Sequence, residues 1–271
     1  MTDGPSNDQI ELNKNFLDGF HNWLYCICVV TFDLELGQAL EATYPRNVDL
    51  SKQDISNICY LAFPDSNSGC MGDTQYTIRL ETSGNEKCPK DYSEYNSKCA
   101  KHLQVDCSYF LGYVYFRQVK DITLPRGYLQ KSVILLTFLP FTNLFSKICT
   151  AIAHEYFENG PDCFQNICSK IGEWPLPMPG SLINLNLLDQ DFQLYVPTSA
   201  DCTVSPSLAL VGETKDSNIQ TCIEDFNLFE VMQSLLSHIH LLWELVITSE
   251  PIVIMASSPA HCSSMVLALT R

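Results

Sequence analysis

The residues able to carry covalent or metal chemistry are spaced in ways that fit none of the common catalytic motifs. His154-Glu155 begins like the H-E-x-x-H helix of a zinc protease, but no second histidine follows at the required position. His238 and His240 lie two residues apart on a predicted helix, so their side chains face different directions. The chain has neither a G-x-S-x-G nucleophile elbow nor a G-x-x-x-x-G-K-[ST] phosphate loop, which argues against a serine hydrolase and against a P-loop GTPase. The sequence therefore predicts no catalytic residue and no cofactor.

The chain has 13 cysteines, and their settings favour reduced thiols over disulfides or zinc ligands. Residues 1–15 are polar and acidic, without the basic and apolar regions of a secretory signal, so we expect the reduced state. The spacings Cys26-x-Cys28 and Cys163-x4-Cys168 do not form the paired C-x2-C of a zinc site. Four cysteines lie in apolar runs, where a free thiol behaves as a small hydrophobic side chain: Cys26, Cys28, Cys59 and Cys149.

Composition and charge favour a folded, acidic protein. Hydrophobic residues make up 46% of the 271 positions, which is typical of a globular chain. The formal net charge of -15 disfavours non-specific binding to nucleic acid or to anionic lipid. The longest apolar run, about residues 133–141, is far shorter than the ~20 residues that span a bilayer. We therefore expect membrane contact only indirectly, through a partner, and no nucleic-acid partner.

The first two thirds of the chain predict one antiparallel-rich sheet covered by helices. Residues 23–32 form a continuous apolar run rich in β-branched and aromatic side chains, which predicts a buried central strand. Residues 81–107 are polar and without period, which indicates a long surface insertion. The expected order is strand, strand, helix, three strands and two helices, at residues 23–32, 37–44, 51–61, 73–80, 109–119, 130–139, 141–157 and 161–171.

The last third predicts a linker followed by a second, smaller group of elements. Three prolines within residues 175–180 mark the linker. The polar stripe of residues 228–247 is narrow, which predicts a long helix buried on most sides. The remaining expectations are a hairpin at 182–196 turning at Asp189–Asp191, a loose stretch at 199–222, a buried strand at 251–256, and a helix that begins at 262.

Several long sequence blocks resemble the DENN-domain family, and specifically its class of DENN domain-containing protein six. They are ordered along the chain and are longer than short motifs. The blocks are CVVTFDLELGQALE at 28–41, NICYLAFPDSNSGC at 57–70, GYVYFRQVKD at 112–121, RGYLQKSV at 126–133 leading into LPF at 139–141, and LWELVITSEP at 242–251 with SSP at 257–259.

This resemblance implies an α/β fold with two lobes, an α+β longin-like upstream lobe and an incomplete α/β core lobe. The implied divisions are a disordered leader at 1–20, the upstream lobe at 21–174, a linker and hairpin at 175–227, and the incomplete core lobe at 228–271. The family pattern continues beyond Arg271, so we expect a fragment, a short isoform or a cropped gene model. Residues 182–271 should then leave apolar surface exposed, while residues 20–174 form the stable unit.

The resemblance also implies a function. Proteins of this family act as guanine nucleotide exchange factors for Rab-family small GTPases in endosomal membrane trafficking. They work in the cytoplasm, are recruited to endosomes, and perform no covalent catalysis. The alternative is a non-catalytic longin-like binding scaffold, or an inactive fragment of such an exchange factor.

Candidate partner-binding residues are polar or aromatic side chains at the ends of predicted elements, where loops can host function. Arg117 and Lys120 are cations at a strand end in an acidic chain. The alternative for each candidate is a cap, a turn or a solvated chain end. The full set is Phe63, Asp65 and Ser66 after the first helix, Arg117 and Lys120, and Ser257 and Ser258 after the last predicted strand.

Overall fold

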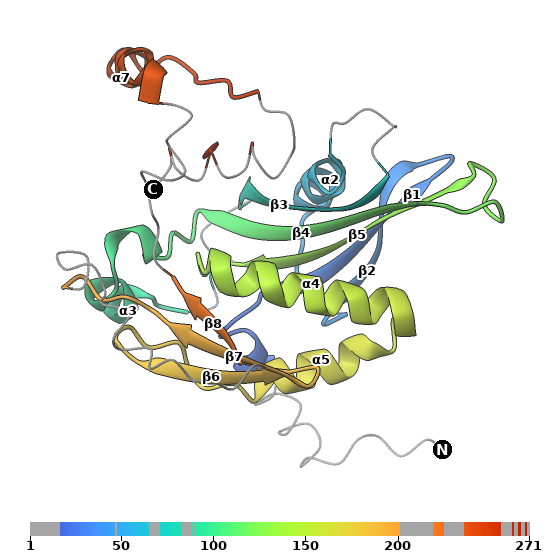
Figure 1. The fold of residues 1–271 in the computed structure, drawn as a ribbon, viewed down its shortest axis with the longest axis horizontal. Coiled ribbons are helices and arrows are strands. Elements are labelled where there is room, and N and C mark those ends of the chain that lie inside the picture. Colours follow the sequence, from blue (N-terminus) through green and yellow to red (C-terminus); the bar gives the residue numbers. More distant parts are fainter. Residues whose placement is uncertain are drawn as a thin grey trace.

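The computed structural model describes most of the chain, as one five-stranded and one three-stranded β-sheet with helices packed around the larger sheet (Figure 1). This mixture of strands and helices confirms the predicted α/β fold class. The described residues are 17–46, 48–64, 71–82, 88, 90–200, 219–224 and 236–255, with residues 262, 265, 266 and 269.

The five-stranded sheet is antiparallel throughout and has the strand order β2-β1-β5-β4-β3. All five strands occur where the sequence predicted them, within a few residues at each end. The predicted strand at 23–32 starts only at Cys26, because residues 21–23 form a turn. The strands are β1 (Cys26–Asp33), β2 (Gly37–Tyr44), β3 (Gly72–Glu81), β4 (Tyr109–Lys120) and β5 (Tyr128–Thr137).

The sequence predicted a sheet covered by helices, and in the structure helices cover both of its faces (Figure 1). Helix α2 (Lys52–Leu61) packs against β2 and β3 on one face. It begins with a capping box, in which Ser51 and Asp54 satisfy each other's backbone N–H groups. On the other face α4 (Thr142–Asn159) packs against β4 and β5, and α5 (Cys163–Gly172) packs against α4 and β2. Cover on both faces explains why the central strands carry continuous apolar runs.

The three-stranded sheet has the order β6-β7-β8. Strands β6 (Leu182–Leu187) and β7 (Gln190–Tyr195) form the predicted hairpin, but the turn lies at Leu188 and Asp189, whose φ angles are both positive. Strand β8 (Ile219–Ile223) runs parallel to β7 within the stretch predicted to be loose. A Ser/Thr/Asn-rich background hid its β-branched residues, and residues 201–218 of that stretch lie outside the described residues.

Tryptophans and a buried glutamate join the two sheets into one hydrophobic core. The rings of Trp23 and Trp174 pack edge to face, 5.3 Å between centroids, and the Trp174 indole donates to the Asn186 carbonyl. Glu224, which directly follows β8, accepts the backbone N–H of Leu144 at 2.7 Å in the first turn of α4. Because Phe141 offers no side-chain cap at this helix start, the carboxylate of Glu224 supplies it.

The polar stretch 81–107 contains buried structure, which the sequence did not predict. It forms α3 (Ser93–Lys98) and the short 3-10 helix η2 (Lys101–Leu103). Cys88, seven residues after the end of β3, forms a disulfide with Cys107, two residues before β4. The prediction that all cysteines are free is therefore wrong for this pair, because the pairing of β3 with β4 brings both ends of the insertion together. Nine other described cysteines are free.

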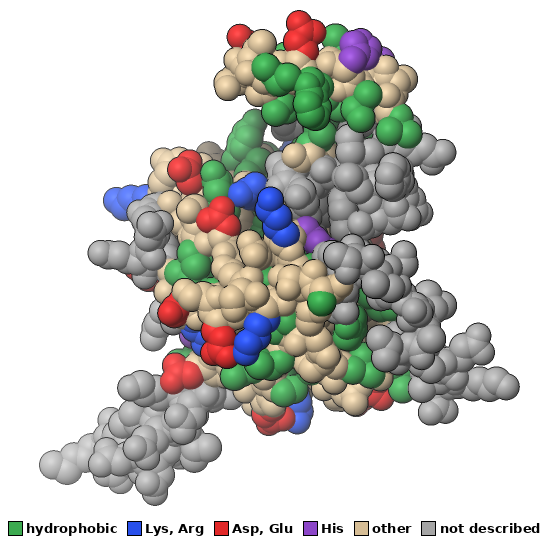
Figure 2. Space-filling view, turned by 90° about the vertical axis from the view of Figure 1, so that its left-hand side faces the viewer, with side chains coloured by type: hydrophobic (Ala, Val, Ile, Leu, Met, Phe, Trp, Pro, Cys, Tyr) green, Lys and Arg blue, Asp and Glu red, His purple; other side chains and the backbone are tan. Residues whose placement is uncertain are grey.

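The C-terminal part of the described chain departs most from the prediction. The helix predicted at 228–247 is present as η5 (Leu236–His238) and α7 (Ile239–Thr248), but none of their residues is buried. Trp243 is 70% exposed, and Figure 2 shows hydrophobic side chains at the surface of this segment, at the top of the molecule. The burial prediction is wrong here because, among the described elements, only η5 contacts α7 appreciably.

The buried strand predicted at 251–256 is also not observed. Residues 251–255 form no strand, and Val253 and Met255 are 83% and 91% exposed. Residue 256 lies outside the described residues. The helix predicted to begin at 262 is seen at residues 262, 265, 266 and 269, which are helical.

The start of the described chain lies within the predicted leader. Residues 17–20 form a helical turn, and Phe20 is fully buried in the core. Gly19 packs so closely on Gly172 that an added Cβ atom would lie 2.1 Å from the Gly172 carbonyl oxygen. Glycine is therefore needed at position 19, where the helical turn of residues 17–20 meets the end of α5.

Candidate partner-binding site

The structure describes three of the seven predicted site residues, and it separates them. Arg117 and Lys120 lie at the end of β4, and Phe63 follows α2. The rings of Phe63 and Phe116 pack 5.3 Å apart, on the face that α2 covers. Because neighbouring residues of a strand point to opposite faces, Arg117 lies on the α4 face instead. The other four predicted residues lie outside the described residues: Asp65, Ser66, Ser257 and Ser258.

Arg117 is held by the residue directly across from it in the sheet. The register of β3 and β4 places Asp73 opposite Arg117. The Arg117 guanidinium donates from Nε and from Nη2 to the two carboxylate oxygens of Asp73, both at 2.7 Å. This bidentate contact lowers the pKa of Asp73 and raises that of Arg117. Both groups therefore remain charged at neutral pH, in a fixed orientation.

A second layer of contacts orients Asp73. The Tyr115 hydroxyl donates to Asp73 Oδ2 at 2.6 Å and lies 2.8 Å from His154 Nε2. Because the hydroxyl has a single proton, His154 Nε2 is the donor in the second contact. Burial, followed by the hydrogen bond to Asp73, raises the pKa of Tyr115 to about 12, so the phenol remains protonated. This network links β3, β4 and α4 at one point.

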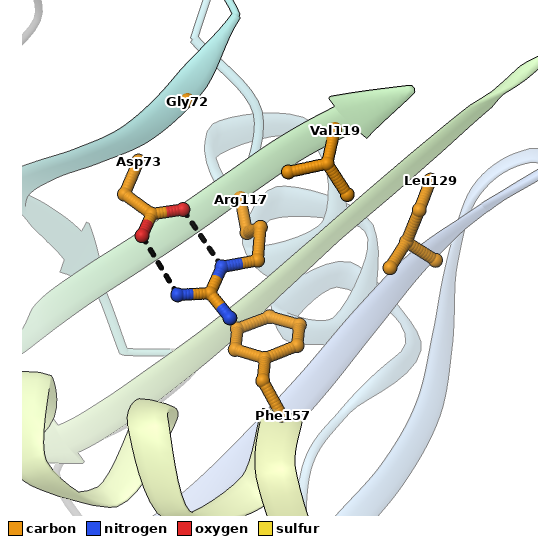
Figure 3. A pocket seen from close by; sticks show the side chains of 6 residues that line it. All are labelled: Gly72, Asp73, Arg117, Val119, Leu129 and Phe157. Carbon is orange, nitrogen blue, oxygen red and sulfur yellow. Dashed lines mark hydrogen bonds and ion pairs between the residues drawn. The ribbon is translucent and has the colours of Figure 1, made fainter. Parts of the chain in front are cut away.

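Beside Arg117 lies an open hollow of about 410 Å³. Figure 3 shows the Arg117 guanidinium above the Phe157 ring, and the distance from Cζ to the ring centroid is 4.3 Å. Val119 and Leu129 supply the apolar wall, from the parts of β4 and β5 that continue past the end of α4. The hollow thus combines an oriented cation, an aromatic ring and apolar side chains, a combination suited to a protein partner.

Lys120 does not line the hollow, because it lies three positions from Arg117 on β4 and so falls on the opposite face of the strand. Its side chain is exposed at the last position of β4, and no ion pair between Lys120 and another described residue is found. It therefore differs from Arg117, whose charge is already balanced by Asp73. An exposed, unbalanced cation affects the approach of a partner more than it affects folding.

The described residues form neither a metal-binding cluster nor a membrane-spanning helix. They contain no group of three or more His, Cys, Asp or Glu side chains placed to hold a metal ion. The histidine that suggested a zinc motif, His154, instead hydrogen-bonds Tyr115. Within the part of the chain that the structure describes, no helix combines the length and apolarity needed to cross a bilayer.

Sequence reasoning missed four residues of this site, namely Asp73, Tyr115, His154 and Phe157. Two local signals could have found some of them. Tyr115 is two positions from Arg117 and so shares its face of the strand. His154 and Phe157 are three apart on one helix face. The pairing of Asp73 with Arg117 depends on strand register, which no local pattern in this sequence fixes.

Comparison with known proteins places the chain in a family. The family model described as "Transport protein Avl9" matches residues 24–169, which run from before β1 to within α5 and include every residue of the hollow. The chain belongs to the Avl9/DENND6 family. This confirms the resemblance seen in the sequence blocks.

Within the Avl9/DENND6 family, similarity extends along almost the whole chain. Protein DENND6B of Mus musculus is 44% identical over 256 residues, covering 93% of this chain and 44% of that protein. Protein DENND6A of Mus musculus is 42% identical over 261 residues, covering 94% of this chain and 43% of that protein. The Protein DENND6 homolog of Dictyostelium discoideum is 30% identical over 316 residues. The chain spans less than half the length of these relatives.

Proposed function

We propose that the chain acts as part of a guanine nucleotide exchange factor for a Rab-family GTPase in endosomal membrane trafficking. The observation that carries the proposal is membership of the Avl9/DENND6 family, over residues that include the complete five-stranded sheet. The relatives are longer than this chain, so the proposal concerns the contribution of these residues to exchange.

The mechanism requires no covalent step. An exchange factor binds the nucleotide-free GTPase more tightly than the nucleotide-bound form. Linkage then requires that the bound factor weakens nucleotide affinity by the same ratio. In this family the lobes hold the switch segments of the GTPase away from the nucleotide, and switch segments are known to pass between ordered and disordered states. GDP leaves, and GTP replaces it.

We propose that the upstream lobe at residues 21–174 contacts the GTPase around the end of β4, where Arg117 and Lys120 lie. In this proposal residues 175–227 join that lobe to the first part of a core lobe at residues 228–271. Phe63, Asp65, Ser66, Ser257 and Ser258 stay predicted contact residues. The protein would work in the cytoplasm and be recruited to endosomes with its GTPase.

Release of a fluorescent GDP analogue from a panel of Rab GTPases tests the proposal. The chain, alone and extended to the length of its relatives, should accelerate release from at least one Rab and bind that Rab most tightly without nucleotide. If neither form accelerates release from any Rab or binds one, the proposed function is wrong.

A second candidate function is a non-catalytic longin-like scaffold, which binds a GTPase without releasing its nucleotide. The observation that favours it is that the two sheets share one core, while residues 236–255 expose apolar side chains. Nucleotide-independent binding of a Rab, with no faster release by either form, would identify the scaffold.

Charge reversal separates the two cations of the proposed contact surface. Lys120→Glu should weaken Rab binding and change its salt dependence without lowering the melting temperature, because its side chain is exposed and unbalanced. Arg117→Glu should weaken binding and also destabilise the sheet, because it places two carboxylates together. Lys101→Glu, the same charge change at an exposed position of η2, is the matched control and should leave binding unchanged. If all three variants bind the Rab as tightly as the wild type does, Arg117 and Lys120 are not part of the interface.

A further inference from the structure

Two hairpin turns project together from one end of the five-stranded sheet. Residues 34–36 connect β1 to β2, and residues 121–127 connect β4 to β5. Because β1 pairs with β5, the two turns are neighbours, and the Arg126 guanidinium lies 3.9 Å from the centroid of the Phe32 ring. Figure 1 shows both turns at the right-hand end of the molecule, beyond the helices that cover the sheet. We call these residues the paired tips.

The paired tips carry large apolar side chains that are exposed to solvent. Ile122 is 96% exposed, Leu36 is 78% exposed and Leu34 is 60% exposed. Leu124 and Tyr128 are also exposed and flank these three. Single exposed apolar residues are ordinary on protein surfaces, but several on two adjoining turns indicate an interaction surface.

Hydrogen bonds within each turn fix the shape in which these side chains are presented. Asp33 Oδ1 accepts the backbone N–H groups of Glu35 at 2.8 Å and Leu36 at 2.9 Å. In the second turn the Asp121 N–H donates to the Gly127 carbonyl at 2.9 Å, and the Gly127 N–H donates to the Leu124 carbonyl at 2.8 Å. These bonds leave fewer backbone groups that depend on water, which lowers the cost of moving the tips into an apolar layer.

The charges around the paired tips indicate which kind of membrane surface the tips can bind. Three acidic residues, Asp33, Glu35 and Asp121, outnumber the two basic residues, Lys120 and Arg126, in a chain of net charge -15. This balance gives no attraction to anionic lipid, so any membrane contact must be driven by the apolar side chains. The tips also project beyond the helices that cover the sheet (Figure 1), and a projecting apolar turn fits the deformable interface of a bilayer.

Helix α7 also exposes apolar side chains, but their arrangement favours burial by protein rather than by a membrane. Its apolar residues lie around most of the helix, which is typical of a helix enclosed by protein rather than one resting on a membrane surface. Its 10 residues are about half the number needed to span a bilayer. The apolar side chains of the paired tips, in contrast, lie together at one end of the five-stranded sheet.

We propose that the paired tips insert into the interfacial region of a zwitterionic lipid bilayer. This goes beyond the proposed exchange function, and beyond the expectation that membrane contact is only through the GTPase. The insertion is shallow and reversible, because a few side chains give weak binding and stable attachment takes a second signal. A GTPase bound to the same membrane supplies that second signal.

Vesicle flotation with the whole chain tests the proposal. The wild-type chain should float with small phosphatidylcholine vesicles, and adding phosphatidylserine or salt should not increase the bound fraction. Leu36→Ser/Ile122→Ser should lower partitioning by ~10-fold or more, because full burial of the two aliphatic side chains would favour insertion by ~100-fold or more and shallow insertion buries only part of each. The matched control Trp243→Ser/Val246→Ser, at two exposed apolar positions of α7, should partition like the wild type.

Four results would overturn the proposal. They are no flotation of the wild-type chain, unchanged flotation of the tip variant with its circular dichroism spectrum intact, binding that needs phosphatidylserine, and loss of binding by the α7 variant alone. Nucleotide release from a GTPase in solution, without vesicles, should be the same for the tip variant and the wild type. That readout separates failure of the membrane proposal from failure of the exchange proposal.

Discussion

The five-stranded sheet and the segment of residues 236–255 are both rich in apolar side chains, yet their burial is opposite. In the sheet, Val133 to Leu136 are completely buried between helices on two faces. In the segment, Trp243 and Val246 are exposed, and α7 has no buried residue. The two regions differ in what surrounds them rather than in their hydrophobicity.

This contrast shows that the apolar content of an element predicts how much of its surface needs to be buried. It does not predict whether neighbouring elements are present to bury that surface. In the sheet, each central strand gains neighbours on both edges from the order β2-β1-β5-β4-β3 and cover on both faces from α2 and α4. Residues 236–255 have no comparable neighbours among the described elements. We therefore expect the two regions to respond very differently to the same kind of change.

The largest expected effect comes from truncating one apolar side chain in each region. Phe145→Ala removes a fully buried ring from α4 and should lower the free energy of unfolding by ~3–5 kcal/mol. Val246→Ala, on the exposed surface of α7, should change it by no more than ~0.5 kcal/mol. Urea denaturation of both variants measures the difference. Similar losses for the two variants would mean that α7 is packed as tightly as the sheet.

A smaller effect should follow removal of the glutamate that caps α4. Glu224→Ala takes away the acceptor for the N–H groups of Leu144 and Asn143 and should lower the free energy of unfolding by ~1–2 kcal/mol. Glu224→Gln keeps an acceptor and should lose less, which makes it the matched control. Thermal melting with both variants tests whether β8 belongs to the same folded unit as the sheet. If Glu224→Ala has the melting temperature of the wild type, β8 does not belong to the same folded unit as the sheet.

The smallest expected effect is the pH dependence of the Asp73–Arg117 contact. The Arg117 guanidinium lowers the pKa of Asp73, so the contact contributes stability above the ordinary aspartate pKa of ~4 and loses it as the pH falls through the lowered value. Because both groups are partly exposed, the contribution should be only ~1 kcal/mol or less. The stability difference between wild type and Asp73→Asn should shrink as the pH is lowered from about 5 towards 2. A difference that stays constant over this range would show that the ion pair does not stabilise the fold.

Much of the fold could be predicted from the sequence, because local patterns determine it. The apolar run after Trp23 predicted β1, and the Ser51 cap predicted the start of α2. The insertion at 81–107 could not be predicted, because its helices are short and the buried Leu103 is one apolar residue in a polar stretch. Burial of α7 was predicted from its narrow polar stripe. Such a stripe indicates how much of a helix needs to be buried, but it does not show that neighbouring elements bury it.

The candidate site was less predictable than the fold, because it depends on contacts between distant residues. Arg117 was identified from its charge at a strand end, but its partner Asp73 lies 44 positions away and is fixed by strand register. Phe157 joins the site only because α4 packs across β4. The prediction that Arg117 contacts a partner stays a prediction, and its contact with Asp73 adds a structural role.

Native-state hydrogen exchange tests the contrast between the two regions most directly. Backbone amides of β1, β4, β5 and α4 should exchange slowly, at rates set by global unfolding, because these elements form the core. Amides of residues 236–255 should exchange orders of magnitude faster, since a helix of ten residues without packing is marginal in water. Equal protection of α7 and the sheet would contradict the account, because it would show that α7 is covered and folded as part of the same unit.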